Sequence, residues 1–260
     1  ATPIDGRAWQ RSGFLHIAWG ATSSLTLSPG VRVAWLTAVQ RTPAISRWLL
    51  GQWSLRPGWN LLGSAGASRQ MPELAYGLGD AGSRDLRPER ARHFDLGIEQ
   101  KLASGVRWQA TVFHRREADV VRFPDLHPRL VGNTIVFPAR QRYVNAVQGT
   151  SRGIELLVSR RTALGLSGWA AYSYGRAHQA DLESGERCWA DSDQRHAFNV
   201  FGGYRFSEKT SVAATFRTGS NFPVPGYLAE RNGRLLVATG RNQVRLHAYA
   251  RLDLRADRQV

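Results

Sequence analysis

The chain has 260 residues, a formal net charge of +15 and a single cysteine, Cys188. No run reaches the roughly 18 apolar residues of a membrane-spanning helix, and one thiol excludes an internal disulfide framework. Only helices and closed β-barrels can span lipid, so the chain is expected to be either soluble or a β-barrel membrane protein. Lys101 and Lys209 are the only lysines among 35 basic residues, so the positive charge is almost entirely arginine.

The first quarter of the chain reads as strands separated by polar turns. We predict strands at residues 14–19, 25–35, 45–55 and 59–67, the last after the turn Arg56-Pro57-Gly58. Residues 70–88 are predicted to form a longer irregular link. Within it, Gly77-Leu78-Gly79-Asp80-Ala81-Gly82 matches G-x-G-x-x-G. A dinucleotide-binding motif must open a helix, and no helical periodicity follows, so a surface loop is predicted here instead.

The chain is organised around a pair of predicted strands within residues 86–121, joined by a short turn at residues 103–105. Side chains alternate between apolar and polar along both strands, and a period of two predicts a strand with two unlike faces. In a barrel wall the apolar side chains lie on the convex face and the charged ones on the concave face. We expect the convex face to carry Phe94, Leu96, Ile98, Trp108, Val112, Leu252 and Leu254, and the concave face Glu99, Arg107, Glu155, Arg251, Asp253 and Arg255.

The rest of the chain repeats this arrangement. Strands are predicted at residues 143–161, 164–174, 198–206, 212–216 and 248–257, with long links at 122–142, 177–193 and 219–245. This makes eleven strands and no convincing helix. From residue 59 onward long and short links alternate, as in outer-membrane barrels with short periplasmic turns and long extracellular loops. We therefore predict an all-β protein in which one antiparallel sheet forms the wall of a transmembrane β-barrel.

Five motifs in order resemble those of TonB-dependent outer-membrane receptors. They are Leu86-Arg87-Pro88-Glu89, Tyr143-Val144-Asn145-Ala146 with Ser151-Arg152-Gly153-Ile154-Glu155, Asp193-Gln194-Arg195-His196-Ala197-Phe198-Asn199, Arg217-Thr218-Gly219-Ser220-Asn221-Phe222-Pro223, and Tyr249-Ala250-Arg251-Leu252-Asp253-Leu254-Arg255. The resemblance implies a location in the bacterial outer membrane and a 22-stranded barrel around an N-terminal plug. Such receptors take up scarce ligands such as iron-siderophores, cobalamin or saccharides with energy passed on by TonB.

The resemblance also predicts the domain content. Residues 1–260 are expected to be a partial receptor barrel domain, roughly the tenth to the twentieth strand, without the plug and without the last strands. The TonB complex would then act through a plug that is not present in this chain. An open set of strands leaves two unpaired edges, which lipid cannot satisfy, so these strands alone are not expected to transport.

The sequence predicts no catalytic residue, no metal site and no cofactor. Cys188, Asp191, Asp193 and His196 lie close together, but their spacing matches no zinc pattern. We expect a small extracellular ligand at the long links, where arginines suit carboxylate, catecholate or phosphate oxygens. This favours a ferric siderophore, with lipopolysaccharide phosphates at the rim as the alternative anion. The candidate ligand-binding residues are Arg84, Arg87, Arg122, Arg129, Arg140, Arg187, Arg231, Arg234 and Arg241.

Two other classes stay open at this point. One is a smaller complete outer-membrane barrel, either a porin-like channel or an enzyme with a catalytic site at its rim. The other is a soluble basic β-protein that binds nucleic acid, which would need aromatic and basic side chains on the same face. In this sequence the two kinds mostly alternate to opposite faces. We therefore expect outer-membrane lipid and lipopolysaccharide as partners, no nucleic acid and no enzymatic activity.

Overall fold

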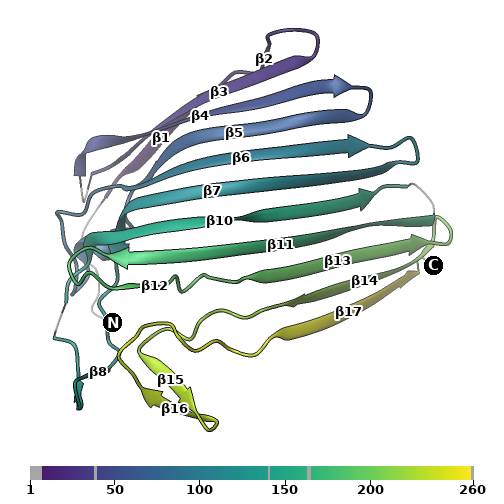
Figure 1. Ribbon diagram of the computed structural model, residues 1–260. Coiled ribbons are helices and arrows are strands. Elements are labelled where there is room, and N and C mark those ends of the chain that lie inside the picture. The colour runs from purple at the N-terminus through teal and green to yellow at the C-terminus, as the bar shows by residue number, and fades with distance from the viewer. Residues whose placement is uncertain (1–7, 38–39, 140, 163–164, 259–260) are drawn as a thin grey trace.

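A computed structural model describes residues 8–37, 40–139, 141–162 and 165–258. The protein is one long, curved antiparallel sheet in which strands consecutive along the chain lie side by side (Figure 1). The sheet follows the order β1 (Gln10–His16), β3 (Leu25–Leu36), β4 (Gln40–Arg56), β5 (Trp59–Gln70), β6 (Glu89–Lys101), β7 (Val106–Arg122), β10 (Val144–Arg160), β11 (Gly165–Asp181), β13 (His196–Arg205), β14 (Thr210–Gly219) and β17 (Tyr249–Arg258). Short strands β2 (Trp19–Gly20) and β12 (Arg187–Trp189) pair with β3 and β11. The predicted all-β antiparallel class is confirmed.

The cross-strand register gathers the large apolar side chains on one face. Leu96 lies opposite Val112, which lies opposite Ile154 on the next strand. These side chains are open to the surroundings, with exposed fractions of 55%, 50% and 46%. A soluble sheet of this kind would bury such a face against a second layer. The main sheet has no second layer over these side chains within the described residues, as the predicted lipid-facing wall requires (Figure 1).

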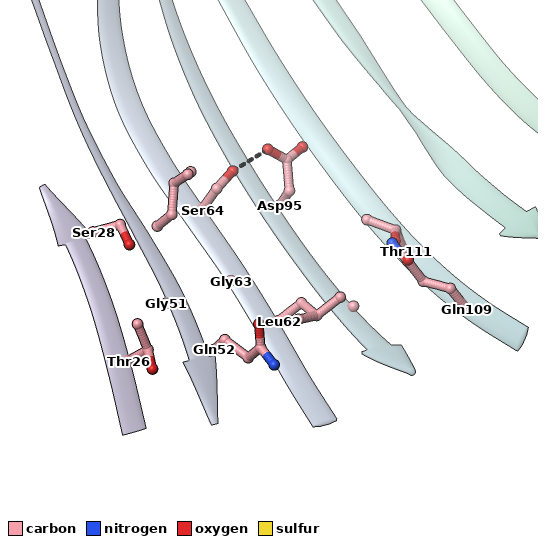
Figure 2. A pocket seen from close by; sticks show the side chains of 12 residues that line it. Thr26, Ser28, Gly51, Gln52, Leu62, Gly63, Ser64, Asp95, Gln109 and Thr111 are labelled. Carbon is pink, nitrogen blue, oxygen red and sulfur yellow. Dashed lines mark hydrogen bonds between the residues drawn. The ribbon is translucent and has the colours of Figure 1, made fainter. Parts of the chain in front are cut away.

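The opposite face is polar and concave. Glu99 lies opposite Gln109, and the same face of β3–β7 is hollowed by a cavity of about 380 Å³. Figure 2 shows its polar wall, in which Ser64 donates a short hydrogen bond to Asp95. The registers of β6, β7, β10, β14 and β17 place the predicted convex and concave residues on the two faces as expected.

The long links hold more regular structure than the sequence pattern predicted. Residues 70–88 contain the single-turn helix α1 (Leu74–Leu78), which runs into the glycine-rich motif rather than out of it. Two hairpins, β8 (Arg129–Val131) with β9 (Thr134–Val136) and β15 (Leu228–Arg231) with β16 (Arg234–Val237), lie in two further links. The described ranges contain no helix that is long and apolar enough to cross a bilayer.

Several strands also run further than predicted at the end where the long links emerge. Residues 177–181 were expected to begin a link, but β11 continues to Asp181 and pairs with β10 to its end. The ladder hydrogen bonds belong to the backbone, so a polar side-chain sequence does not end them. The sheet therefore extends beyond its apolar rows into a polar zone below the loops.

Candidate ligand-binding site

Three of the long links converge on the concave face of β7, β10 and β11. These links are residues 123–143, 182–195 and 220–248, and with the sheet they border a cavity of about 1020 Å³. Figure 1 shows the hairpins of these links at the end of the sheet opposite the tight turns. We call this space the loop-end cavity. It is large enough for a small organic ligand.

The charges that line the loop-end cavity nearly cancel. Four arginines, Arg115, Arg122, Arg129 and Arg241, face five carboxylates, Glu117, Asp125, Asp181, Glu186 and Asp191. Most of these groups are already paired within the protein. Arg115 binds Glu117 at 2.7 Å, and Arg122 at the end of β7 binds Asp181 at 2.9 Å and Glu183 at 2.7 Å. The cavity is therefore lined by paired charges of both signs and is not a uniformly positive site.

Arg241 connects all three links. Its guanidinium lies 3.3 Å from the Asp125 carboxylate in the first link and 3.5 Å from the Asp191 carboxylate in the second. The Arg241 and Asp125 side chains are only 18% and 17% exposed, so this contact is shielded from water, whereas Asp191 is half exposed. Charge pairs with reduced solvent contact are screened less by salt than exposed ones. This residue therefore stabilises the closed arrangement of the loops.

Asp125 is held in its charged form. Burial alone would raise the pKa of the Asp125 carboxyl, but hydrogen bonds from the backbone and ring of His127, together with the charge of Arg241, lower that pKa below its ordinary value. The two His127 contacts measure 3.0 and 2.9 Å. The stabilisation is thus fully present above the carboxyl's unfolded pKa, about 3.9, and is lost only as the pH falls through the lower folded value.

We expect the loop-end cavity to keep its shape from pH 7 down to about pH 4 and to open only below that. Tyr227 is a suitable probe of the cavity's shape, since its side chain is only 5% exposed in the structure. Hydroxyl-radical oxidation of Tyr227, read by mass spectrometry, should stay low across the upper range and rise below it. Asp125→Asn should show higher oxidation already at pH 7. Oxidation of the unaltered protein that rises between pH 7 and pH 5 would contradict this assignment.

A second network fixes the base of the loops. Asp193 is 1% exposed and accepts hydrogen bonds from the Ala177 backbone N–H at 2.6 Å and from Arg245. Asn242 is fully buried and donates to the Trp189 carbonyl at 2.8 Å and to Asp191 at 2.5 Å. Both networks join link 220–248 to link 182–195. The cavity wall is therefore cross-linked by buried polar contacts.

Two side chains that could do chemistry are protonated at neutral pH. Burial, and then the hydrogen bond that the Tyr227 hydroxyl donates to Glu186 at 2.7 Å, raise the pKa of Tyr227 to about 12. Burial also raises the pKa of the Cys188 thiol, which weakens it as a nucleophile and as a metal ligand. Among the described residues, no group of three or more histidine, cysteine, aspartate and glutamate side chains could hold a metal ion.

The nine predicted arginines fall into separate groups. Arg122, Arg129 and Arg241 line the loop-end cavity. Arg87 is 60% exposed and binds Asp119 at 3.1 Å, away from the cavity. Four others, Arg84, Arg187, Arg231 and Arg234, are exposed in the links or their short strands and do not line it. Arg140 lies outside the described residues.

Sequence reasoning missed the carboxylates and Tyr227 that complete the cavity. Asp125, Asp191 and Glu186 are ordinary loop residues in the sequence, and their pairing with Arg241 and Tyr227 depends on how three links fold together. The sequence did contain a signal for the β15–β16 hairpin of the third link, namely Asn232-Gly233. Their φ angles of 53° and 72° suit a type I′ hairpin turn, for which Asn-Gly is the strongest short signal.

The whole chain matches a known family. Residues 2–259 match the family described as TonB dependent receptor-like, beta-barrel. No curated protein matches the sequence of the chain. Solved structures of similar fold include an FrpB iron transporter from Neisseria meningitidis, at 16% identity and a TM-score of 0.68, over 97% of this chain and 38% of that one. The ferripyoverdine receptor of the Pseudomonas aeruginosa outer membrane is 16% identical with a TM-score of 0.68, over 97% of this chain and 33% of that one. The copper transporter OprC is 13% identical with a TM-score of 0.66, over 97% of this chain and 40% of that one.

Proposed function

Because the chain belongs to the TonB-dependent receptor β-barrel family, we propose that it forms part of the wall of an outer-membrane receptor for active uptake of a scarce small ligand. The loop-end cavity carries this proposal, since three long links close around a ligand-sized space at one end of a lipid-exposed sheet. Loops on a rigid wall are the usual place for recognition. The same arrangement favours transport over an enzymatic role.

The chain spans 38% of the length of the FrpB structure, so activity belongs to a larger assembly in this proposal. Residues 1–260 supply one continuous part of the barrel domain, within a barrel of 22 strands. The plug domain and the closing strands belong to parts of the receptor outside residues 1–260, and the TonB complex acts through that plug. The convex face of the sheet lies against outer-membrane lipid, and the loops face outward with lipopolysaccharide around them.

We propose a ferric siderophore as the ligand. Such a ligand presents anionic oxygens, which a planar guanidinium binds well. Arg129 is the cavity arginine best placed for this, since the other three are paired with carboxylates. The described residues include no carboxylate partner for Arg129, whose guanidinium lies 6.0 Å from the Tyr227 ring centroid. The Tyr227 hydroxyl next to Glu186 forms the neighbouring polar wall.

Uptake of ⁵⁵Fe-labelled siderophores tests this function in cells that rely on the receptor containing this chain. A catecholate or carboxylate ferric complex should be taken up, and cobalamin should not. Arg129→Gln should weaken binding of that complex about tenfold, near 1.4 kcal/mol, because one charge-assisted contact is lost. Arg84→Gln is the matched control, since Arg84 is exposed outside the cavity. Uptake of a neutral ligand instead, or equal losses in both variants, would contradict the proposed ligand or its site.

A further inference from the structure

The convex face carries a cluster of arginines just beyond its apolar rows, on the side of the long links. Arg92 of β6 lies directly opposite Arg116 of β7, and Arg152 of β10 lies directly opposite Arg176 of β11. Arg116 pairs in register with Thr150, two residues from Arg152, so the two pairs are diagonal neighbours. We call these four residues the arginine belt. All four side chains are exposed.

The belt borders the apolar surface without a gap. In the row of Arg152 and Arg176 the neighbouring side chains are His114 and Phe94, and the next row holds Leu96, Val112, Ile154 and Tyr174. Phe94 is 57% exposed. A basic strip at the edge of a lipid-facing surface lies at the depth of the lipid headgroups. Because it lies on the side of the long links, it belongs to the leaflet toward which the loops point.

The belt has no carboxylate to balance its charge among the described residues. Glu117 is next to Arg116 in sequence, but it faces the concave side and binds Arg115 at 2.7 Å. Asp119 binds Arg87 and Arg90 instead. The belt contacts that do occur are neutral or aromatic, with Arg116 donating to the His114 ring at 3.2 Å and Arg176 lying 5.7 Å from the Tyr174 ring.

Two directly opposed pairs of like charges destabilise a sheet unless an anion lies between them. The belt crosses four adjacent strands, a width of about 14 Å from the usual strand spacing. Several phosphates on one headgroup can contact such a width, and guanidinium groups bind phosphate oxygens in pairs. Acyl chains attached to that headgroup would lie on the apolar rows directly below. The belt therefore matches a lipid in both its charged and its apolar parts.

We propose that the arginine belt is a binding site for a multiply phosphorylated lipid of the outer leaflet, of the lipopolysaccharide class. This inference rests on the proposed function, because it takes the loops to face the outer leaflet. It differs from ligand recognition, since the belt lies on the convex face and the loop-end cavity opens on the concave one. The lipid stabilises the wall by separating the opposed guanidinium groups.

The test uses the purified receptor in detergent, with bisphosphorylated lipid A as the probe. Arg92→Gln with Arg116→Gln, and Arg152→Gln with Arg176→Gln, should each weaken lipid A binding about 30-fold, and all four together on the order of 1000-fold, at about 1 kcal/mol per arginine. The control is Arg160→Gln, which changes an exposed arginine on the same face at the opposite end of β10. It should bind lipid A as the unaltered protein does.

A second readout separates lipid binding from a merely structural role. Without lipid, the belt variants should melt at or above the temperature of the unaltered protein, since like-charge repulsion is relieved. Lipid A should raise the melting temperature of the unaltered protein by more than that of the variants. Dephosphorylated lipid A and phosphatidylglycerol should give much smaller shifts. Equal lipid A binding by all variants would overturn the site, and an equal shift with phosphatidylglycerol would overturn the lipid class.

The proposed function can fail separately. Siderophore uptake that persists in belt variants with unchanged lipid A binding would leave the transport function intact and remove this inference. Binding that depends on Arg160 rather than on the belt would place the phosphorylated lipid at the turn end and contradict the assumed orientation. Both results are read from protein that keeps the heat-modifiable gel mobility of an assembled barrel, so that misfolded variants do not enter the comparison.

Discussion

Leu156→Arg is expected to prevent assembly of the sheet in a membrane, whereas Leu157→Arg is expected to be tolerated. Leu156 is 45% exposed on the convex face and lies in the row formed by Ala110 on one side and Tyr172 on the other. This row is well inside the apolar surface, and an arginine near the bilayer midplane of a barrel costs roughly 2–4 kcal/mol. Leu157 is the next residue, and its side chain points to the opposite face.

The comparison is sharp because the two variants differ only in the face that receives the charge. Leu157 lies opposite Gln109 and Ala171 on the concave side, where water and polar side chains can solvate a guanidinium. Assembly is measured by the heat-modifiable gel shift after folding into lipid vesicles and by the protein level in isolated outer membranes. Equal assembly of both variants would contradict the contact of Leu156 with lipid. Failure of Leu157→Arg alone would mean that the lipid-facing and water-facing sides are assigned the wrong way round.

The fold was largely predictable because a period of two fixes the face of every residue once one face is known. Leu252 and Asp253 alternate in sequence and separate to opposite faces in the sheet, as the neighbouring Phe216 and Thr215 do. What the pattern could not predict is where a strand ends once its side chains turn polar. The stretch from Arg176 to Asp181 continues β11 through backbone pairing that leaves no trace in hydropathy.

The candidate site was predictable only in part. The alternation of long and short links indicated that the loops gather at one end, and arginine chemistry pointed to Arg122, Arg129 and Arg241. It could not show that Arg241 is held by Asp125 and Asp191, since these residues are distant in sequence. The same residue type therefore has two roles here. Arg241 positions the loops, while Arg129 stays available to a ligand in our proposal.

Asp193→Ala is expected to release link 220–248 from the rest of the loop-end cavity while the sheet still assembles. The Asp193 carboxylate is buried and accepts hydrogen bonds from Arg245 and from the Ala177 backbone N–H. Its removal leaves Arg245, which is only 24% exposed, without its carboxylate partner. Loss of one partner of a buried ion pair costs about 3–5 kcal/mol, because the remaining charge stays poorly solvated.

This loss of stability should be confined to the link and should be measurable as faster backbone hydrogen exchange there. Backbone amides of residues 220–248 that are protected in the unaltered protein should exchange on the order of 100- to 1000-fold faster in the variant, while those of β7 and β10 keep their protection. Asp253→Ala is the matched control, since it breaks a pair with Arg251 whose side chains are 71% and 45% exposed. Exposed ion pairs contribute little to stability, so that variant should leave exchange in the link unchanged. Equal exchange in both variants would show that the buried Asp193–Arg245 pair does not hold the loops, and siderophore binding should then be unaffected as well.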